Sequence, residues 1–207
     1  MNHERIASPR GLLRRLAGSS LFLAVAAAGS LACVSQPGED SAAEPRVRDD
    51  LLLSPELLPT PFSAAEIRDG NTPGTTRTYL VMTGGELELE RTTFLEDPKG
   101  LARFRSERRG LDGESLGEPG EAAAPWEALQ RHASYPRAEA ARTDAICTTA
   151  AGRFDAWLYD WRQPARDGEP ASRHRVWFAK EVPGPPVLYE TTVDGELVFR
   201  MELIEAD

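Results

Sequence analysis

The pentapeptide Gly113–Gly117 matches the pattern G-x-S-x-G, with Ser115 at its centre. In hydrolases with this pattern the serine sits on a strained turn between a strand and a helix, where its hydroxyl meets a histidine and an oxyanion hole. Here the match lies in a Gly- and Glu-rich stretch, residues 109–124, which we expect to be an exposed loop without either element beside it. We therefore expect no catalysis, and an exported serine hydrolase that uses Ser115 with His174 is the alternative.

The histidines and cysteines show no metal-ligand spacing. Beyond residues 1–32 the chain contains His132, His174, Cys33 and Cys147, and none of them stands in H-x-x-x-H, H-E-x-x-H or C-x-x-C. We expect no metal and no cofactor, because a zinc site would need scattered carboxylates as further ligands. Cys147 lies in an apolar segment without a basic neighbour, which predicts a buried structural thiol rather than a reactive one.

Four aromatic residues are the one feature that favours binding. Trp157, Tyr159 and Trp161 alternate along one segment, so a strand would place them on one face, and Trp177 lies on the next segment. A buried core layer is the first interpretation of this stripe. The second is an amphipathic wall that binds an apolar ligand or a partner protein, with these four residues as the candidate ligand-binding site.

The amino-terminal segment predicts export. Residues 1–20 carry four arginines against one glutamate, and residues 16–32 carry no charge. A basic stretch followed by a short apolar stretch and small residues is typical of a secretory signal peptide. The apolar run is interrupted at Gly29 and Ser30, and it is shorter than the ~20 residues that a membrane-spanning helix needs.

Residues 30–33, Ser-Leu-Ala-Cys, resemble the lipobox of bacterial lipoproteins. The resemblance implies that the signal peptide, residues 1–32, is removed and that Cys33 is lipidated with diacylglycerol, whose acyl chains are of the palmitate type. Two or three chains keep a protein on a membrane, because each buried methylene contributes ~0.8 kcal/mol. Val34 in place of an aspartate favours, by the same resemblance, the outer membrane facing the periplasm. The alternative is an ordinary cleaved signal, which would leave Cys33 free to form a disulfide with Cys147.

The composition fits one globular domain. The chain has 207 residues, of which 41% are hydrophobic and 28% charged, and its formal net charge is −9. Residues 1–32 carry +3, so the remainder carries −12. This acidic balance argues against a generalised nucleic-acid binder, and we expect no nucleic-acid partner.

The remaining chain predicts a tether followed by a β-rich globular domain. The tether, residues 33–60, joins the lipidated cysteine to a spacer without apolar periodicity, although residues 51–61 are apolar enough to pack along the domain edge. The domain is expected to span residues 61–207. A capping box at its start predicts a short helix over 63–68, and a proline in the first turn predicts another over 125–132.

Alternation of apolar and polar residues predicts seven or eight short strands in this domain. The dipeptides Gly84-Gly85 and Asp194-Gly195 predict tight hairpins, because glycine adopts positive φ at little cost. The predicted fold class is α+β, with a single mostly antiparallel curved sheet, as a half-barrel or small sandwich, and two short helices.

The last 60 or so residues resemble uncharacterised bacterial envelope lipoproteins with a TapB/LolA-like curved β-sheet domain. The resemblance rests on Ala-Gly-Arg-Phe at 151–154 before the aromatic strand, on Val-Pro-Gly-Pro-Pro-Val at 182–187, and on the closing hairpin at 195–203. It implies a curved antiparallel sheet in an exported protein. The first half of the chain departs from the pattern, so the lipid-carrier activity of that family is not transferred.

Together these features predict a membrane-anchored envelope lipoprotein that is not an enzyme, and whose β-domain binds an apolar ligand or an envelope protein. A purely structural surface protein is a further alternative, which predicts a filled core without a groove beside Trp157 and Trp161.

We expect Cys33→Ser to release the protein from the membrane, because the serine hydroxyl cannot form the thioether. In a bacterial host, the wild-type chain should sediment with membranes and yield an acylated amino-terminal peptide in mass spectrometry. A membrane-bound variant, together with a wild-type peptide of unmodified mass, would contradict the anchor.

Overall fold

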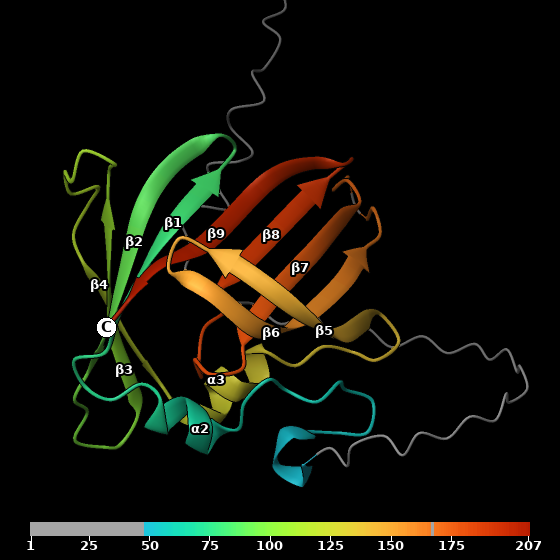
Figure 1. Cartoon of the computed structure of the whole chain (residues 1–207), viewed down its shortest axis with the longest axis horizontal. Coiled ribbons are helices and arrows are strands. Elements are labelled where there is room, and N and C mark those ends of the chain that lie inside the picture. Colours follow the sequence, from blue (N-terminus) through green and yellow to red (C-terminus); the bar gives the residue numbers. More distant parts are fainter. Residues whose placement is uncertain (1–47, 167) are drawn as a thin grey trace, which may run out of the picture. The chain divides into compact units, whose positions relative to one another are not determined.

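The computed structural model describes residues 48–166 and 168–207, and the predicted signal peptide, Cys33 and the tether up to residue 47 lie outside them. The described residues form one nine-stranded antiparallel sheet in the order β4-β3-β2-β1-β9-β8-β7-β6-β5 (Figure 1). The predicted α+β class, with a curved antiparallel sheet and two short helices, is confirmed. The elements are the 3-10 helix η1 (Asp49–Leu51), α2 (Ala64–Asp69), β1 (Thr76–Thr83), β2 (Glu86–Leu95), β3 (Ala102–Arg109), β4 (Gly120–Ala124), α3 (Trp126–His132), β5 (Ala140–Thr149), β6 (Gly152–Gln163), β7 (Ser172–Ala179), β8 (Leu188–Val193) and β9 (Glu196–Ala206).

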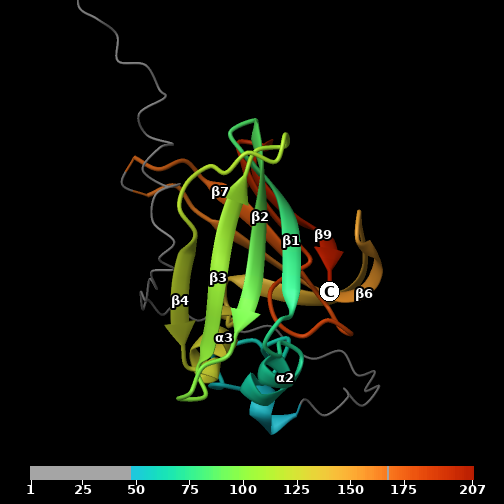
Figure 2. The same ribbon diagram turned by 90° about the vertical axis from the view of Figure 1, so that its left-hand side faces the viewer.

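The sheet consists of two meanders that meet where the first strand pairs with the last. Strands β1–β4 are neighbours in chain order, and so are β5–β9. Between them, β1 pairs with β9 from Arg77 opposite Ala206 to Thr83 opposite Phe199. Figure 2 shows β1–β4 as one curved layer with α2 and α3 near one end of the strands.

Both predicted two-residue hairpins are confirmed. Gly84 and Gly85 have φ angles of 58° and 88°, and Asp194 and Gly195 have φ angles of 52° and 85°. Positive φ at both central residues is the requirement of a type I′ turn, whose twist matches that of the flanking strands.

The prediction that residues 109–124 form a loop throughout is wrong at its end. Strand β4 pairs with β3, and Glu121 accepts hydrogen bonds from Arg103 (2.7 Å) and Arg105 (2.6 Å) across the pair. Its sequence, Gly-Glu-Ala-Ala-Ala, has no β-branched or aromatic residue and therefore carries little strand signal.

Residues 48–60 pack against the domain rather than extending freely from it. Leu51 is buried, and Leu57 forms an isolated β-bridge with Pro136. The predicted packing of residues 51–61 along the domain edge is thus confirmed.

The buried amide of Gln130 on α3 ties this segment to the helices. Its Nε2 donates to the carbonyl oxygen of Asp50 (2.8 Å) and to Oγ1 of Thr60 (3.1 Å), while its Oε1 accepts from the backbone N–H of Ala64 (3.0 Å). Next to it, Ser63 and Glu66 form the predicted capping box at the start of α2.

The strand register defines two faces of the sheet. On β6 and β7, Tyr159 lies opposite Val176, and Trp157 lies opposite Phe178. These side chains pack with Phe62 and residues of α2 and α3, so we call this side the helical face. Other buried residues, among them Cys147, Ala156 and Trp177 of the opposite face, form a second cluster. Near this cluster the β5–β6 turn contacts β9, where the backbone N–H of Ala150 donates to Oε1 of Glu202.

We expect Gln130→Met to lower the free energy of unfolding by ~2–3 kcal/mol, because it leaves buried backbone groups of Asp50 and Ala64 without partners. Urea unfolding followed by tryptophan fluorescence measures the change. The control is Arg131→Gln at the next, exposed position, which should stay within ~0.5 kcal/mol of wild type. Equal stability of Gln130→Met and wild type would contradict this role of the amide.

Candidate functional site

The structure does not bring Ser115 and His174 together. Ser115 lies on the exposed loop after β3, and its hydroxyl donates to the carbonyl oxygen of Gly117 (2.7 Å). His174 lies on β7, and four strands separate β3 from β7 in the sheet order. The serine of the G-x-S-x-G match and His174 therefore lie on separate parts of the sheet.

The four predicted aromatic residues fall on two faces. Trp157, Tyr159 and Trp161 share the helical face, as their alternation predicts, whereas Trp177 lies opposite Leu158 on the other face and packs in the second cluster. Tyr159 is fully buried and donates its hydroxyl to the carbonyl oxygen of Pro59 (2.5 Å). Tyr159 and Trp177 are thus core residues.

Trp157 is half-buried between core and surface. Its ring meets Phe62 edge to face at 5.7 Å, and the guanidinium of Arg142 lies 4.7 Å from its centroid. The ring is therefore already covered on one side by protein and on another by a cation. Trp161 is partly exposed as well, and the ring centroid of Tyr135 lies 4.6 Å from its own.

Four rings form a continuous row across four adjacent strands on the helical face, and we call Trp161, His174, Tyr189 and Phe199 the aromatic row. Trp161 on β6 stacks on His174 of β7 at 4.8 Å with an interplanar angle of 11°. His174 lies 6.2 Å from Tyr189 of β8, which meets Phe199 of β9 at 5.2 Å. Each of these residues remains partly exposed, and Tyr135, which follows α3, packs on Trp161 at the end of the row.

Hydroxyl groups fix the imidazole within the row. Ser172 Oγ lies 2.9 Å from Nε2 of His174, and both Tyr189 OH and Thr191 Oγ1 lie 3.1 Å from Nδ1. Burial lowers the pKa of His174 below its usual range. The ring is therefore uncharged at neutral pH, and with its nitrogens already bonded it presents mainly an aromatic face.

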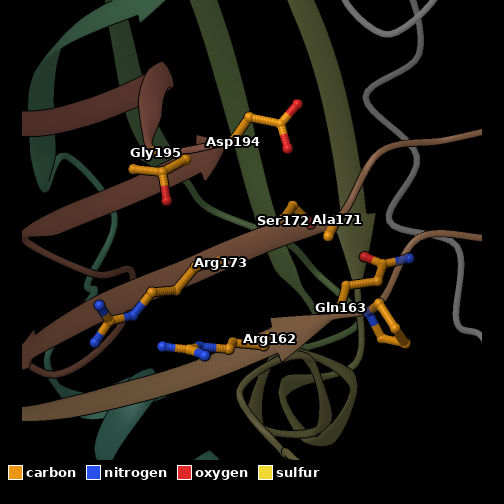
Figure 3. Close-up of a pocket in the computed structure, with 9 residues that line it drawn as sticks. Arg162, Gln163, Ala171, Ser172, Arg173, Asp194 and Gly195 are labelled. Atoms are coloured by element: carbon orange, nitrogen blue, oxygen red, sulfur yellow. The ribbon is translucent and has the colours of Figure 1, made fainter.

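A cavity of about 520 Å³ lies at the end of the sheet where the β6–β7 and β8–β9 hairpins meet, and Arg162, Arg173 and Thr192 of its lining point to the face opposite the aromatic row. Ser172 lines it and also contacts His174. Figure 3 shows Arg162 and Arg173 extending alongside each other from adjacent strands, with Asp194 and Gly195 on the other side of the cavity. Its volume lies in the range of small-molecule sites, which is ~300–1,000 Å³.

The sequence analysis missed His174, Tyr189 and Phe199 as parts of one surface. A regular two-residue hairpin at Asp194-Gly195 would place Arg200, not Phe199, on the face of Tyr189. A bulge between Thr191 and Thr192 shifts the register by one residue, which exchanges the faces. No turn residue marks this bulge in the sequence, so only the structure assigns Phe199 to the helical face.

Three further features were sought among the described residues: a metal site, a reactive thiol and a membrane-spanning helix. No group of three or more His, Cys, Asp or Glu residues that could hold a metal ion occurs among them. Cys147 is buried, and burial raises the pKa of its thiol to about 11. No helix within residues 48–166 and 168–207 is long and apolar enough to cross a lipid bilayer.

We expect the stability of the protein to fall as the pH drops below ~6.5, in part because the unfolded histidine takes up a proton that folded His174 resists. In His174→Gln this contribution is lost, so the fall in unfolding free energy between pH 7.5 and 5.5 should be smaller than in wild type. Gln163→Ala, at the exposed end of β6, is the control, because it removes no titratable group. Identical pH dependence of wild type and His174→Gln would contradict the neutral imidazole.

No protein-family model and no curated protein sequence matches this chain. Among solved structures, it is similar to a "putative lipoprotein" from Parabacteroides distasonis, with 13% identity and a TM-score of 0.45 over 66% of this chain and 96% of that one. An exported protein with a YmcC-like fold from Bacteroides fragilis gives 13% identity and a TM-score of 0.43 over 66% and 97% of the two chains. MucB gives 10% identity and a TM-score of 0.46 over 69% of this chain and 56% of MucB.

Proposed function

We propose that this protein is a lipid-anchored, non-enzymatic envelope protein that binds an apolar molecule on its aromatic row. The observation that carries the proposal is the continuous contact from Trp161 through His174 and Tyr189 to Phe199, on rings that remain partly exposed. Aromatic surfaces of this kind gain free energy when a ligand removes them from water.

The contrast along single strands supports a binding role for the row. On β6, Tyr159 is fully buried whereas Trp161, two residues further along the same face, is partly exposed. On β7, Val176 is buried and His174 is partly exposed in the same way. The helices thus cover one part of the face and leave the neighbouring part, with its larger rings, available to an apolar occupant.

The polar groups of the site favour an uncharged, apolar ligand part next to the rings. The imidazole of His174 is neutral, and both of its nitrogens are bonded to hydroxyls. Arg173, which is paired with Asp160, neighbours His174 on β7 and projects from the opposite face. A ligand on the row therefore meets ring faces and the hydroxyls around His174.

The anchor and the location rest on the amino-terminal sequence, which lies outside the described residues. The basic and apolar segments of residues 1–32, followed by Cys33, support export and lipidation. We place the protein at the outer membrane facing the periplasm, because Val34 rather than aspartate follows Cys33. A protein held by its amino terminus could then present the aromatic row to ligands within the envelope.

We expect native mass spectrometry of the detergent-free chain, carrying Cys33→Ser, to show a lipid-sized adduct. Trp161→Ala and Phe199→Ala should each reduce the adduct at least tenfold, because each removes one ring from the contact surface. Leu87→Ala is the matched control, since Leu87 is exposed on the opposite face and should leave the adduct unchanged. If the protein with an unaltered aromatic row shows only the mass of the unliganded chain, ligand binding is contradicted and a protein partner is favoured.

A further inference from the structure

The sheet ends on one side at a long, regular strand. Strand β5 is the last in the sheet order, has ten residues and contains no proline. It pairs with β6 along its whole length without a bulge. The strand at the opposite edge, β4, has only five residues. Proteins protect sheet edges with short strands, prolines or bulges, so the edge at β5 is the one open to pairing with a further strand.

A hydrogen bond on the far side of β6 shows which backbone groups of β5 point away from the sheet. The carbonyl oxygen of Asp155 on β6 accepts from the backbone N–H of Lys180, after β7 (2.8 Å). Its partner on β5, Ile146, therefore belongs to a pair that is not hydrogen-bonded, and its own N–H and C=O point outward. Every second residue along β5 has the same direction.

Four residues of β5 present their backbone groups outward in this way: Arg142, Asp144, Ile146 and Thr148. Within residues 48–166 and 168–207, no other segment hydrogen-bonds to these groups, and the coverage ends at Ala140, whose N–H donates to the carbonyl oxygen of Pro136 (3.0 Å). Ile146 is 52% exposed, and Asp144 and Thr148 are exposed as well. The outer edge of β5 is therefore accessible as a whole.

The side chains of β5 are complementary to a second copy of the same strand. Arg142 and Asp144 lie two positions apart on the helical face. If two copies of β5 pair antiparallel about Thr143, Arg142 of each copy lies opposite Asp144 of the other, which gives two cross-strand ion pairs. On the opposite face Thr143 meets its own copy, a favourable pair, and Ala141 lies opposite Ala145 without crowding.

Other registers lack this complementarity. A slip of two residues places Arg142 opposite Arg142 or Asp144 opposite Asp144, and like charges directly opposite each other are destabilising. A slip of four residues centres the pair on Ala145 and places the carboxylate of Asp144 opposite the apolar side chain of Ile146. The charge pattern of the strand thus favours the register about Thr143.

Both charged side chains are available for such a contact. The carboxylate of Asp144 is 80% exposed, and Lys180 bonds to its Oδ1, which leaves Oδ2 for a second cation. The guanidinium of Arg142 lies 4.7 Å from the ring centroid of Trp157, which holds it on the helical face next to the edge. Little side-chain freedom is then lost when Arg142 pairs.

We propose that two copies of this protein associate through β5, paired antiparallel about Thr143, so that their sheets become one continuous sheet. The two-fold axis of this pair is perpendicular to the sheet, so both copies carry their helical faces and aromatic rows on the same side. The inference goes beyond the proposed function and does not depend on a ligand.

Cysteine cross-linking tests the register. In the chain carrying Cys33→Ser the remaining Cys147 is buried, so an added surface cysteine is the reactive thiol. Thr143→Cys places two thiols in a pair that is not hydrogen-bonded, with Cα atoms ~4.5 Å apart, a separation that a disulfide spans. We expect a covalent dimer on a non-reducing gel after oxidation. Thr148→Cys is the matched control and should stay monomeric, because this register separates the two copies of the residue by ~33 Å.

Charge exchange tests the ion pairs, with self-association measured by sedimentation equilibrium. Arg142→Glu and Asp144→Lys should each weaken the association about tenfold, because each places like charges opposite each other twice. An equimolar mixture of the two variants should associate as tightly as wild type, because both pairs are again opposite in sign. Arg91→Glu, exposed on the other face of β2, is the control and should leave the association unchanged.

Three outcomes would overturn the inference. A wild-type chain that sediments as a monomer, together with no cross-link from Thr143→Cys, excludes the pairing. A cross-link from Ala145→Cys in place of Thr143→Cys shows the slipped register, in which the two ion pairs are wrong. Arg142→Glu that associates as tightly as wild type also excludes them. Ligand binding to the aromatic row is measured separately by native mass spectrometry, so each of these failures leaves the proposed function standing.

Discussion

The pairing of β1 with β9 is the contact on which the rest of the structure depends. It joins residues near the beginning and the end of the described chain, and the backbone groups of Thr76 and Asp207 exchange hydrogen bonds beyond it. Without it the two meanders would be separate sheets, each with two open edges. With it, one continuous face runs from Tyr79 and Val81 on β1 to the aromatic row on β6–β9. Because this pairing closes a long loop, its formation has a large entropic cost that the buried residues Tyr79, Val81 and Leu203 help to offset.

Residues of the helical segments cover only part of that face, and the proposed binding site lies on the part that stays partly exposed. Helix α3 and the segment before α2 are held together by Gln130, and they bury Tyr159, Val176 and Phe178. Tyr135 covers part of Trp161, and the four rings of the row are left partly exposed. Burial lowers the pKa of His174 and the hydroxyls around it fix the ring, which maintains an apolar surface in a chain of strongly negative net charge.

Local signals in the sequence were sufficient for those parts of the fold that depend on neighbouring residues. The type I′ hairpins follow from Gly84-Gly85 and Asp194-Gly195, and the capping box at Ser63 predicts α2 at its correct start. Strand β4 was missed because its stability comes from pairing with β3 and from Glu121 contacts, not from its own residues. For the site, alternation alone placed Trp157, Tyr159 and Trp161 on one face, but it could not separate the buried Tyr159 from the accessible Trp161.

The sequence by itself determined the antiparallel class, the tight turns, the acidic balance and the signals for export and lipidation. The acidic balance follows from composition, and the other features depend on residues a few positions apart. The tertiary structure alone decided which rings meet. The bulge between Thr191 and Thr192 moves Phe199 to the face of Tyr189, and the register with β7 and β6 then adds His174 and Trp161. It alone also left β5 at the edge of the sheet, since the place of a strand depends on strands distant in sequence. Strand register is a cooperative property of the whole sheet, and a shift of one residue exchanges its two faces.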